Sequence, residues 1–174
     1  YAVAKAAAAL YARFFHSLYA TPVVTARIFM VYGPGQVDHT KLVPYSILRA
    51  LRKEPPRLTS GTRPVDWIFI DDVVAGLLAA GEVAGVEGET FDLGSGELIT
   101  VRQIVEKICH ALAAPPPELG ARADRPLEAV RRANIAKSIS RLGWRPQVGL
   151  EEGLHRTIVG LRGELASGAH VVRG

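Results

Sequence analysis

Stretches of helical periodicity alternate with short apolar runs along the chain. Residues 2–19 are rich in Ala and Leu, which are strong helix formers, and Pro22 ends this stretch. Continuous β-branched runs indicate buried strands. The pattern predicts helices at 2–19, 41–53, 73–83, 101–112, 135–142 and 150–165, and strands at 23–29, 65–70 and 90–93.

The order of these elements predicts an α/β fold. Apolar strands that follow helices are typical of an open parallel sheet, in which ligands bind beyond the carboxyl ends of the strands. The turn Tyr32–Gly35 follows the first expected strand and would lie at such an end, although a plain surface turn is the alternative. Asp71 or Asp72 is expected to cap the helix at 73–83, because a carboxylate accepts the free amide protons of a helix start.

Composition excludes several classes of protein. With 48% apolar and 22% charged residues, the chain of 174 residues is typical of a globular protein. Its net charge of +4 comes from scattered arginines, which favours solubility over nucleic-acid binding. No apolar run reaches the roughly 18 residues of a membrane helix, and the histidines lack metal-ligand spacing, so we expect no membrane partner and no metal. The single Cys109 excludes an internal disulfide and favours a reducing compartment, so we expect a cytoplasmic protein.

The first helix carries a pair of residues with catalytic chemistry. Tyr1 and Lys5 are four positions apart and lie on one helix face. An ammonium group beside a phenol favours the phenolate, and a tyrosine in that setting can give and take a proton near neutral pH. The same spacing occurs on many helices by chance, so the pair gains weight only from the rest of the chain.

Two further stretches invite comparison with phosphate-binding segments. Gly94-Ser95-Gly96 follows a strand and precedes a helix, but Ile99 stands where the third glycine of a dinucleotide fingerprint would fall. We therefore reject a phosphate loop there and expect Thr100 to cap the next helix. The arginine-rich stretch 122–132 indicates either a solvated face or a segment that holds a pyrophosphate.

Five motifs occur in a fixed order. They are Tyr-x-x-x-Lys at 1–5, Arg-Ile-Phe-Met-Val-Tyr-Gly-Pro at 27–34, Val-Asp-Trp-Ile-Phe-Ile-Asp-Asp-Val at 65–73, Phe-Asp-Leu-Gly-Ser-Gly at 91–96, and Leu-Gly-Trp-Arg-Pro at 142–146 with Leu-Glu-Glu-Gly-Leu at 150–154. Together they resemble the extended short-chain dehydrogenase/reductases, the NAD-dependent epimerase/dehydratase family that acts on nucleotide sugars. The resemblance runs from residue 1 to about residue 162.

This resemblance implies the C-terminal part of a doubly wound Rossmann-type parallel sheet with a small α/β substrate-binding lobe. The Rossmann part would span about 1–35 and 64–95, and the lobe about 36–63 and 96–166. The family's N-terminal nucleotide-binding half would precede Tyr1, so we expect the chain to be a portion of a longer protein. Members of the family often pair through the helix with the Tyr-x-x-x-Lys motif, which implies a homodimer.

The resemblance also implies a cofactor, NAD or NADP, and its contacts. Tyr1 would exchange a proton with the sugar, while Lys5 would favour the phenolate and hold the nicotinamide ribose. Phe29 and Val31, in the loop after the first strand, would contact the nicotinamide. The function implied is NAD(P)-dependent epimerisation or dehydration of a nucleotide sugar.

The expected substrate contacts depart from the family pattern. Met30 stands where many members have Asn, and Val65 stands where many have an Arg for the pyrophosphate. Arg63 lies two residues before Val65, and Arg125 matches a later Arg-Pro of the family. Met30, Arg63 and Arg125 are therefore the candidate substrate residues. A less polar pocket favours the alternative of a reductase of a non-sugar carbonyl or sterol-like substrate. A non-catalytic NAD(P)-binding regulator is the alternative from another class.

Overall fold

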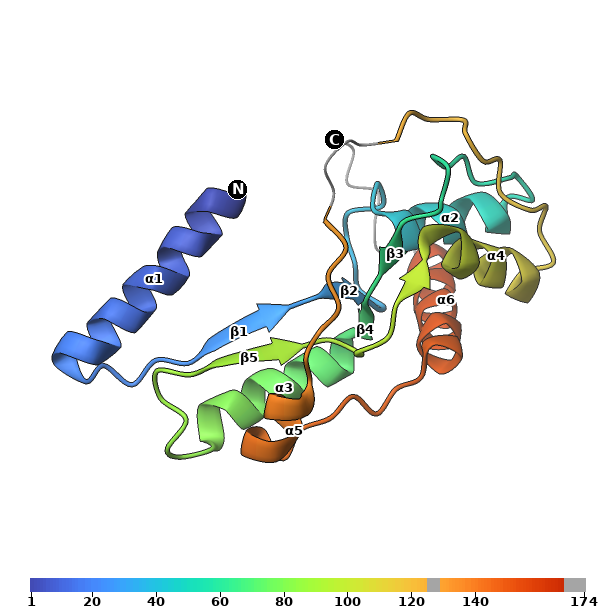
Figure 1. The fold of residues 1–174 in the computed structure, drawn as a ribbon. Coiled ribbons are helices and arrows are strands. Elements are labelled where there is room, and N and C mark those ends of the chain that lie inside the picture. Colours follow the sequence, from blue (N-terminus) through green and yellow to red (C-terminus); the bar gives the residue numbers. More distant parts are fainter. Residues whose placement is uncertain (125–128, 168–174) are drawn as a thin grey trace.

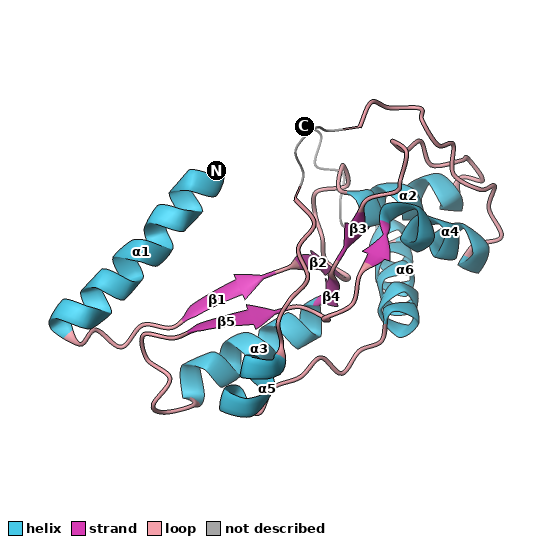
Figure 2. Cartoon of the chain, in the orientation of Figure 1, coloured by secondary structure: helices cyan, strands magenta, loops and turns pink. Residues whose placement is uncertain are grey.

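Parallel strands run through the middle of the chain, as the apolar runs predict (Figures 1 and 2). The structure, a computed structural model, describes residues 1–124 and 129–167. Its helices are α1 Ala2–Tyr19, α2 Leu42–Leu51, α3 Ile70–Glu82, α4 Val101–Ala111, α5 Ala136–Leu142 and α6 Leu150–Ala166. Its strands are β1 Thr25–Ile28, β2 Met30–Tyr32, β3 Pro64–Val65, β4 Trp67–Phe69, β5 Thr90–Leu93 and β6 Ile99–Thr100.

The expected strand at 23–29 is in fact divided where the chain changes its pairing partner. β1 pairs in parallel with β5, whereas β2 pairs in parallel with β4. At the division, the Phe29 amide donates to the carbonyl of Leu93 at 3.0 Å, and the Met30 amide donates to the carbonyl of Asp66 at 3.0 Å. The ladder therefore passes from one neighbour to the other within two residues.

The expected strand at 65–70 is divided in the same way. β3 pairs antiparallel with β6, and β4 pairs with β2. Asp66 lies between β3 and β4 and is 1% exposed. Ile70 is not part of the strand, because α3 already begins there.

The apolar side chains form two cores rather than one. The first joins α2, α4 and α6 to β4, with Ile47, Ile104 and Ile158 among its buried members. The second lies around β5, α3 and α5, and Phe91 and Trp144 belong to it. The helices with the clearest sequence periodicity thus build the first core, on the side of the lobe.

α1 is set apart from both cores. It has no buried residue, and Figure 1 shows it beside the strands rather than packed on them. It ends at Ala20, which has a left-handed conformation with φ 52°. Large apolar side chains along it, such as Tyr11 and Leu18, are exposed.

The two helix caps expected from sequence have different outcomes. Thr100 caps α4, because its hydroxyl accepts from the Gln103 amide at 3.2 Å and the Gln103 side chain accepts from the Thr100 amide at 2.8 Å. The expectation for α3 is wrong, since this helix begins at Ile70 without a side-chain cap. The Asp72 carboxylate instead accepts from the amides of Gln147 and Val148, at 2.9 and 3.0 Å.

A close helix contact gives the first testable prediction. A Cβ atom at Gly153 in α6 would meet the hydroxyl of Tyr32, and would lie 2.9 Å from its Cζ and 3.0 Å from Cδ2 of Phe69. Both rings are buried, and overpacking a core is costly, so Gly153→Ala should lower the free energy of unfolding by about 1–3 kcal/mol. Urea unfolding followed by circular dichroism measures this change.

Gly163→Ala, on the same helix, is the matched control. A Cβ atom there meets nothing within 4 Å, so alanine should raise the stability by up to about 1 kcal/mol through helix propensity. An equal effect of the two variants would contradict the close packing of α6 on Tyr32.

Candidate functional site

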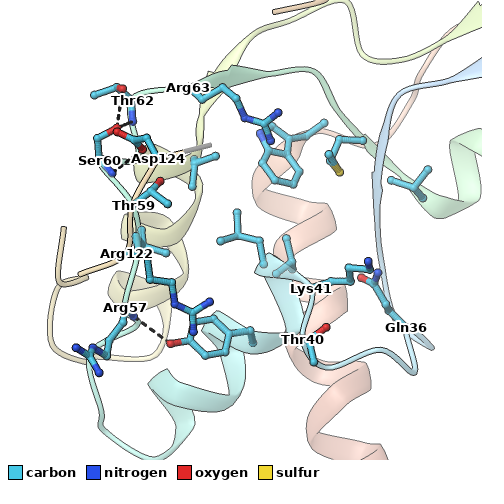
Figure 3. Close-up of a pocket in the computed structure, with 18 residues that line it drawn as sticks. Gln36, Thr40, Lys41, Arg57, Thr59, Ser60, Thr62, Arg63, Arg122 and Asp124 are labelled. Carbon is cyan, nitrogen blue, oxygen red and sulfur yellow. Dashed lines mark hydrogen bonds between the residues drawn. The ribbon is translucent and has the colours of Figure 1, made fainter. Parts of the chain in front are cut away.

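A cavity of about 810 Å³ opens beyond the carboxyl end of β1 (Figure 3). Met30 and Val31 of β2 form one part of its wall, and Trp67 of β4 lies next to them in the sheet. Residues 40–45 at the start of α2 form another part, and the segment 57–63 forms a third. The cavity is thus framed by the sheet and by the lobe.

Basic side chains dominate the charge of this cavity. Arg57, Arg63, Arg122 and Lys41 line it, and Figure 3 shows the Arg63 side chain directed into it. Lys41 is also paired with Asp38, at 3.4 Å, and Arg57 with Glu118, at 3.3 Å. A wall with several guanidinium groups suits an anionic ligand such as a phosphate, because each group offers paired N–H donors.

Hydroxyl groups and one carboxylate complete the polar wall. Asp124 accepts from the amide and hydroxyl of Ser60, at 3.1 and 3.0 Å. These hydrogen bonds, the one from the Ser60 amide first, hold the pKa of Asp124 below its usual range. Thr59 and Thr62 add further hydroxyls to the same wall. The site can therefore accept hydrogen bonds as well as donate them.

The structure brings three of the expected residues to the cavity. Met30 is 41% exposed there, and Val31 and Arg63 also line it. Val65 is 8% exposed and packs into the first core. Position 65 therefore presents no side chain to a ligand.

The remaining expected residues lie elsewhere. Tyr1 is 97% exposed at the start of α1, and the Lys5 ammonium lies 5.6 Å from the centroid of its ring. The two share one face of α1, but neither lines the cavity. Phe29 does not line the cavity either, and its amide donates to the carbonyl of Leu93. Arg125 falls outside the described residues.

Sequence reasoning missed several residues of the cavity wall. No sequence pattern marks Arg57, Tyr45 or Lys41 as a binding residue, because each lies in a segment with the pattern of an ordinary helix or turn. Arg122 does belong to such a pattern, since it begins the arginine-rich stretch 122–132. The structure places its guanidinium 5.3 Å from the centroid of the Tyr45 ring.

A buried carboxylate positions the loop between β5 and β6. Asp66 Oδ1 accepts from the amide and hydroxyl of Ser95, at 2.7 and 2.8 Å, and Oδ2 accepts from the amides of Gly96 and Ala133, at 3.0 and 2.9 Å. The segment Gly94-Ser95-Gly96 thus binds a carboxylate of its own chain. This use agrees with the rejection of a phosphate loop there.

Among the described residues, no group of three or more His, Cys, Asp or Glu side chains could hold a metal ion. No helix in the described ranges is both long and apolar enough to cross a membrane.

Parallel strands, flanking helices and a polar cavity beyond a strand end define a Rossmann-type α/β protein. Solved structures share this fold, among them a UDP-glucose 4-epimerase with UDP-glucose from Thermotoga maritima. The match to that structure has a TM-score of 0.87 and 29% identity, and covers 95% of this chain and 54% of the other. A dTDP-glucose 4,6-dehydratase from Bacillus anthracis in complex with NAD has a TM-score of 0.87 and 25% identity, over 95% of this chain and 53% of the other.

The chain belongs to the NAD dependent epimerase/dehydratase family, which it matches over residues 1–94. It is 33% identical to a dTDP-glucose 4,6-dehydratase of Neisseria gonorrhoeae, over 91% of this chain and 49% of the relative. It is 30% identical to a UDP-glucose 4-epimerase of Mycolicibacterium smegmatis, over 91% of this chain and 51% of the relative. The chain therefore spans about half the length of these relatives.

The carboxylate of Asp66 gives the second prediction. In Asp66→Asn, one oxygen becomes an amide NH2 that cannot accept, so at least one buried backbone N–H loses its acceptor whichever oxygen is replaced. The free energy of unfolding should fall by about 2–4 kcal/mol. Urea titration measures the loss. Asp71→Asn is the control, since the Asp71 side chain is 64% exposed and should change stability by less than about 0.5 kcal/mol. Equal stability of the two variants would show that the Asp66 bonds contribute little.

Proposed function

We propose that the protein to which this chain belongs is an NAD-dependent epimerase or dehydratase of a nucleotide sugar. The observation that carries the proposal is the cavity beyond β1, whose wall combines three arginines, a lysine and several hydroxyls. A diphosphate linked to a sugar needs both kinds of contact. Membership of the family and the named activities of the relatives support this assignment.

The proposed proton transfer rests on Tyr1 and Lys5. Both are exposed on one face of α1, within one turn, which fits a ligand that approaches from outside this helix. Tyr1 would take a proton from a sugar hydroxyl or return one, and the Lys5 ammonium would favour the phenolate. The same ammonium fits a contact to the hydroxyls of the nicotinamide ribose. When bound, NAD would supply hydride transfer, and the protein supplies orientation and electrostatics.

The other proposed contacts follow the end of β1. Phe29 joins β1 to β2 and Val31 lies within β2, and we assign both to the nicotinamide side. Met30 and Arg63 line the cavity and are assigned to the substrate. Arg125 keeps its proposed contact with the diphosphate on the basis of its sequence motif alone.

The alternatives receive less support. A sterol-like substrate would not use the charges of Arg57, Arg63 and Arg122. The named relatives are enzymes of nucleotide sugars, which also disfavours a non-catalytic regulator. We also propose a homodimer through α1, whose apolar side chains are exposed, and a cytoplasmic location, which the single buried Cys109 favours.

The third prediction tests the catalytic role of Tyr1 in the complete protein. Tyr1→Phe should lower kcat by at least about a hundredfold, because the hydroxyl performs general acid/base work. Affinity for NAD should change little, since the ring remains. Steady-state kinetics with UDP- and dTDP-sugars provide the measurement.

Tyr11→Phe is the control, because Tyr11 is a second exposed tyrosine of α1, at 65% exposure, and should leave kcat unchanged. Near-normal turnover by Tyr1→Phe would favour a non-catalytic function instead.

The fourth prediction concerns the diphosphate. Arg63→Ala and Arg125→Ala should each weaken a sugar nucleotide by about 1.5–3 kcal/mol, the usual loss for a hydrogen bond to a charged group. Calorimetric titration of the complete protein measures both. Arg145→Ala is the control, since Arg145 is exposed and does not line the cavity. If neither variant differs from this control, the substrate carries no diphosphate and the non-sugar reductase becomes the better assignment.

A further inference from the structure

An arginine is stacked on a tyrosine at the end of the cavity opposite to Arg63. The Arg122 guanidinium lies 5.3 Å from the centroid of the Tyr45 ring. Figure 3 shows Arg122 and Arg57 at one end of the cavity and Arg63 at the other. A ligand whose diphosphate contacts Arg63 would extend toward this stacked pair.

Both members of the pair are held in place by the chain. The Tyr45 hydroxyl accepts from the Arg57 amide at 3.2 Å, which sets the orientation of the ring. The Arg122 amide donates to the carbonyl of Leu58 at 3.1 Å. Two residues earlier, the Gly120 amide donates to the carbonyl of Thr59 at 2.9 Å. The stack therefore exists before a ligand binds, and little conformational freedom is lost on binding.

The surroundings of the pair favour a flat, partly apolar group over a second phosphate. Leu42 and Leu58 line the cavity, one turn before Tyr45 on α2 and next to Arg57 respectively. The carboxylate of Asp124 is not part of these surroundings, because Figure 3 shows it beside Ser60 and Thr62, toward the Arg63 end. Guanidinium planes and aromatic rings are surfaces on which nucleobases stack.

We infer that Arg122, supported by Tyr45, is the platform on which the base of the bound nucleoside diphosphate stacks. This inference rests on the proposed function and assigns the end of the cavity that the family motifs leave unassigned. Arg122 then contributes to affinity by stacking its guanidinium plane on the base, whereas Arg63 contributes by attracting the diphosphate with its positive charge. The two arginines should respond differently to substitution by lysine, which keeps the charge and removes the plane.

The test is calorimetric titration of the complete protein with UDP, dTDP, GDP and inorganic pyrophosphate. Arg122→Lys should weaken the nucleoside diphosphate that the wild type binds most tightly by about five- to tenfold, while pyrophosphate affinity stays unchanged. Tyr45→Leu, which removes the supporting ring, should act in the same direction. Arg131→Lys is the matched control, because Arg131 is exposed and lies outside the cavity, and it should change neither affinity.

The possible failures are separable. If Arg122→Lys weakens pyrophosphate as much as the nucleoside diphosphate, Arg122 is a phosphate ligand and the stacking inference is wrong. If it weakens neither, Arg122 does not contact the ligand and the inference is equally wrong, although the proposed function stands. If the wild type binds none of the three nucleoside diphosphates, the proposed function fails and the inference fails with it.

Discussion

Buried aspartate carboxylates that accept backbone N–H groups hold the second half of this fold together. Asp66, Asp72 and Asp92 each lie in or beside the sheet and are at most 6% exposed. Their partners lie far along the chain, at Ala133 for Asp66, at Gln147 and Val148 for Asp72, and at Asn134 for Asp92. A buried charge is costly unless it is hydrogen-bonded, and here the segment after α4 supplies part of the donors, in addition to Ser95 and Gly96 for Asp66 and Arg27 for Asp92. That segment is thereby fixed to the sheet without adding a strand to it.

The same carboxylates connect the sheet to the cavity. Asp66 orients Ser95 and Gly96, and the chain then enters β6, which pairs with β3. Beyond the pair, the Val101 amide donates to the carbonyl of Arg63 at 3.0 Å, which fixes the backbone from which this side chain enters the cavity. The position of a cationic group at the site thus depends on the contacts of a buried anion between β3 and β4.

The elements that sequence predicts well are those in which the decisive contacts are local. α4 was predicted with its cap, because Thr100 and Gln103 are three residues apart and complete each other's hydrogen bonds. The division of the first strand was not predicted. It depends on hydrogen bonds from the Phe29 and Met30 amides to the carbonyls of Leu93 and Asp66, which lie 64 and 36 residues further along. Asp72 was assigned to the nearest helix start, whereas its true partners follow 75 and 76 residues later. The Tyr45–Arg122 stack joins segments equally far apart, so no spacing rule indicates it.

Position 65 serves the core, whereas the positive charge of the neighbouring cavity comes from other positions. Val65 ends β3 and packs into the first core, which an arginine at this position could join only by burying its guanidinium. Arg63 lies two residues earlier, before the start of β3. There its side chain reaches the cavity, and Arg57 and Arg122 add positive charge from the segments that follow α2 and α4. An apolar residue at position 65 therefore strengthens the core without making the cavity apolar.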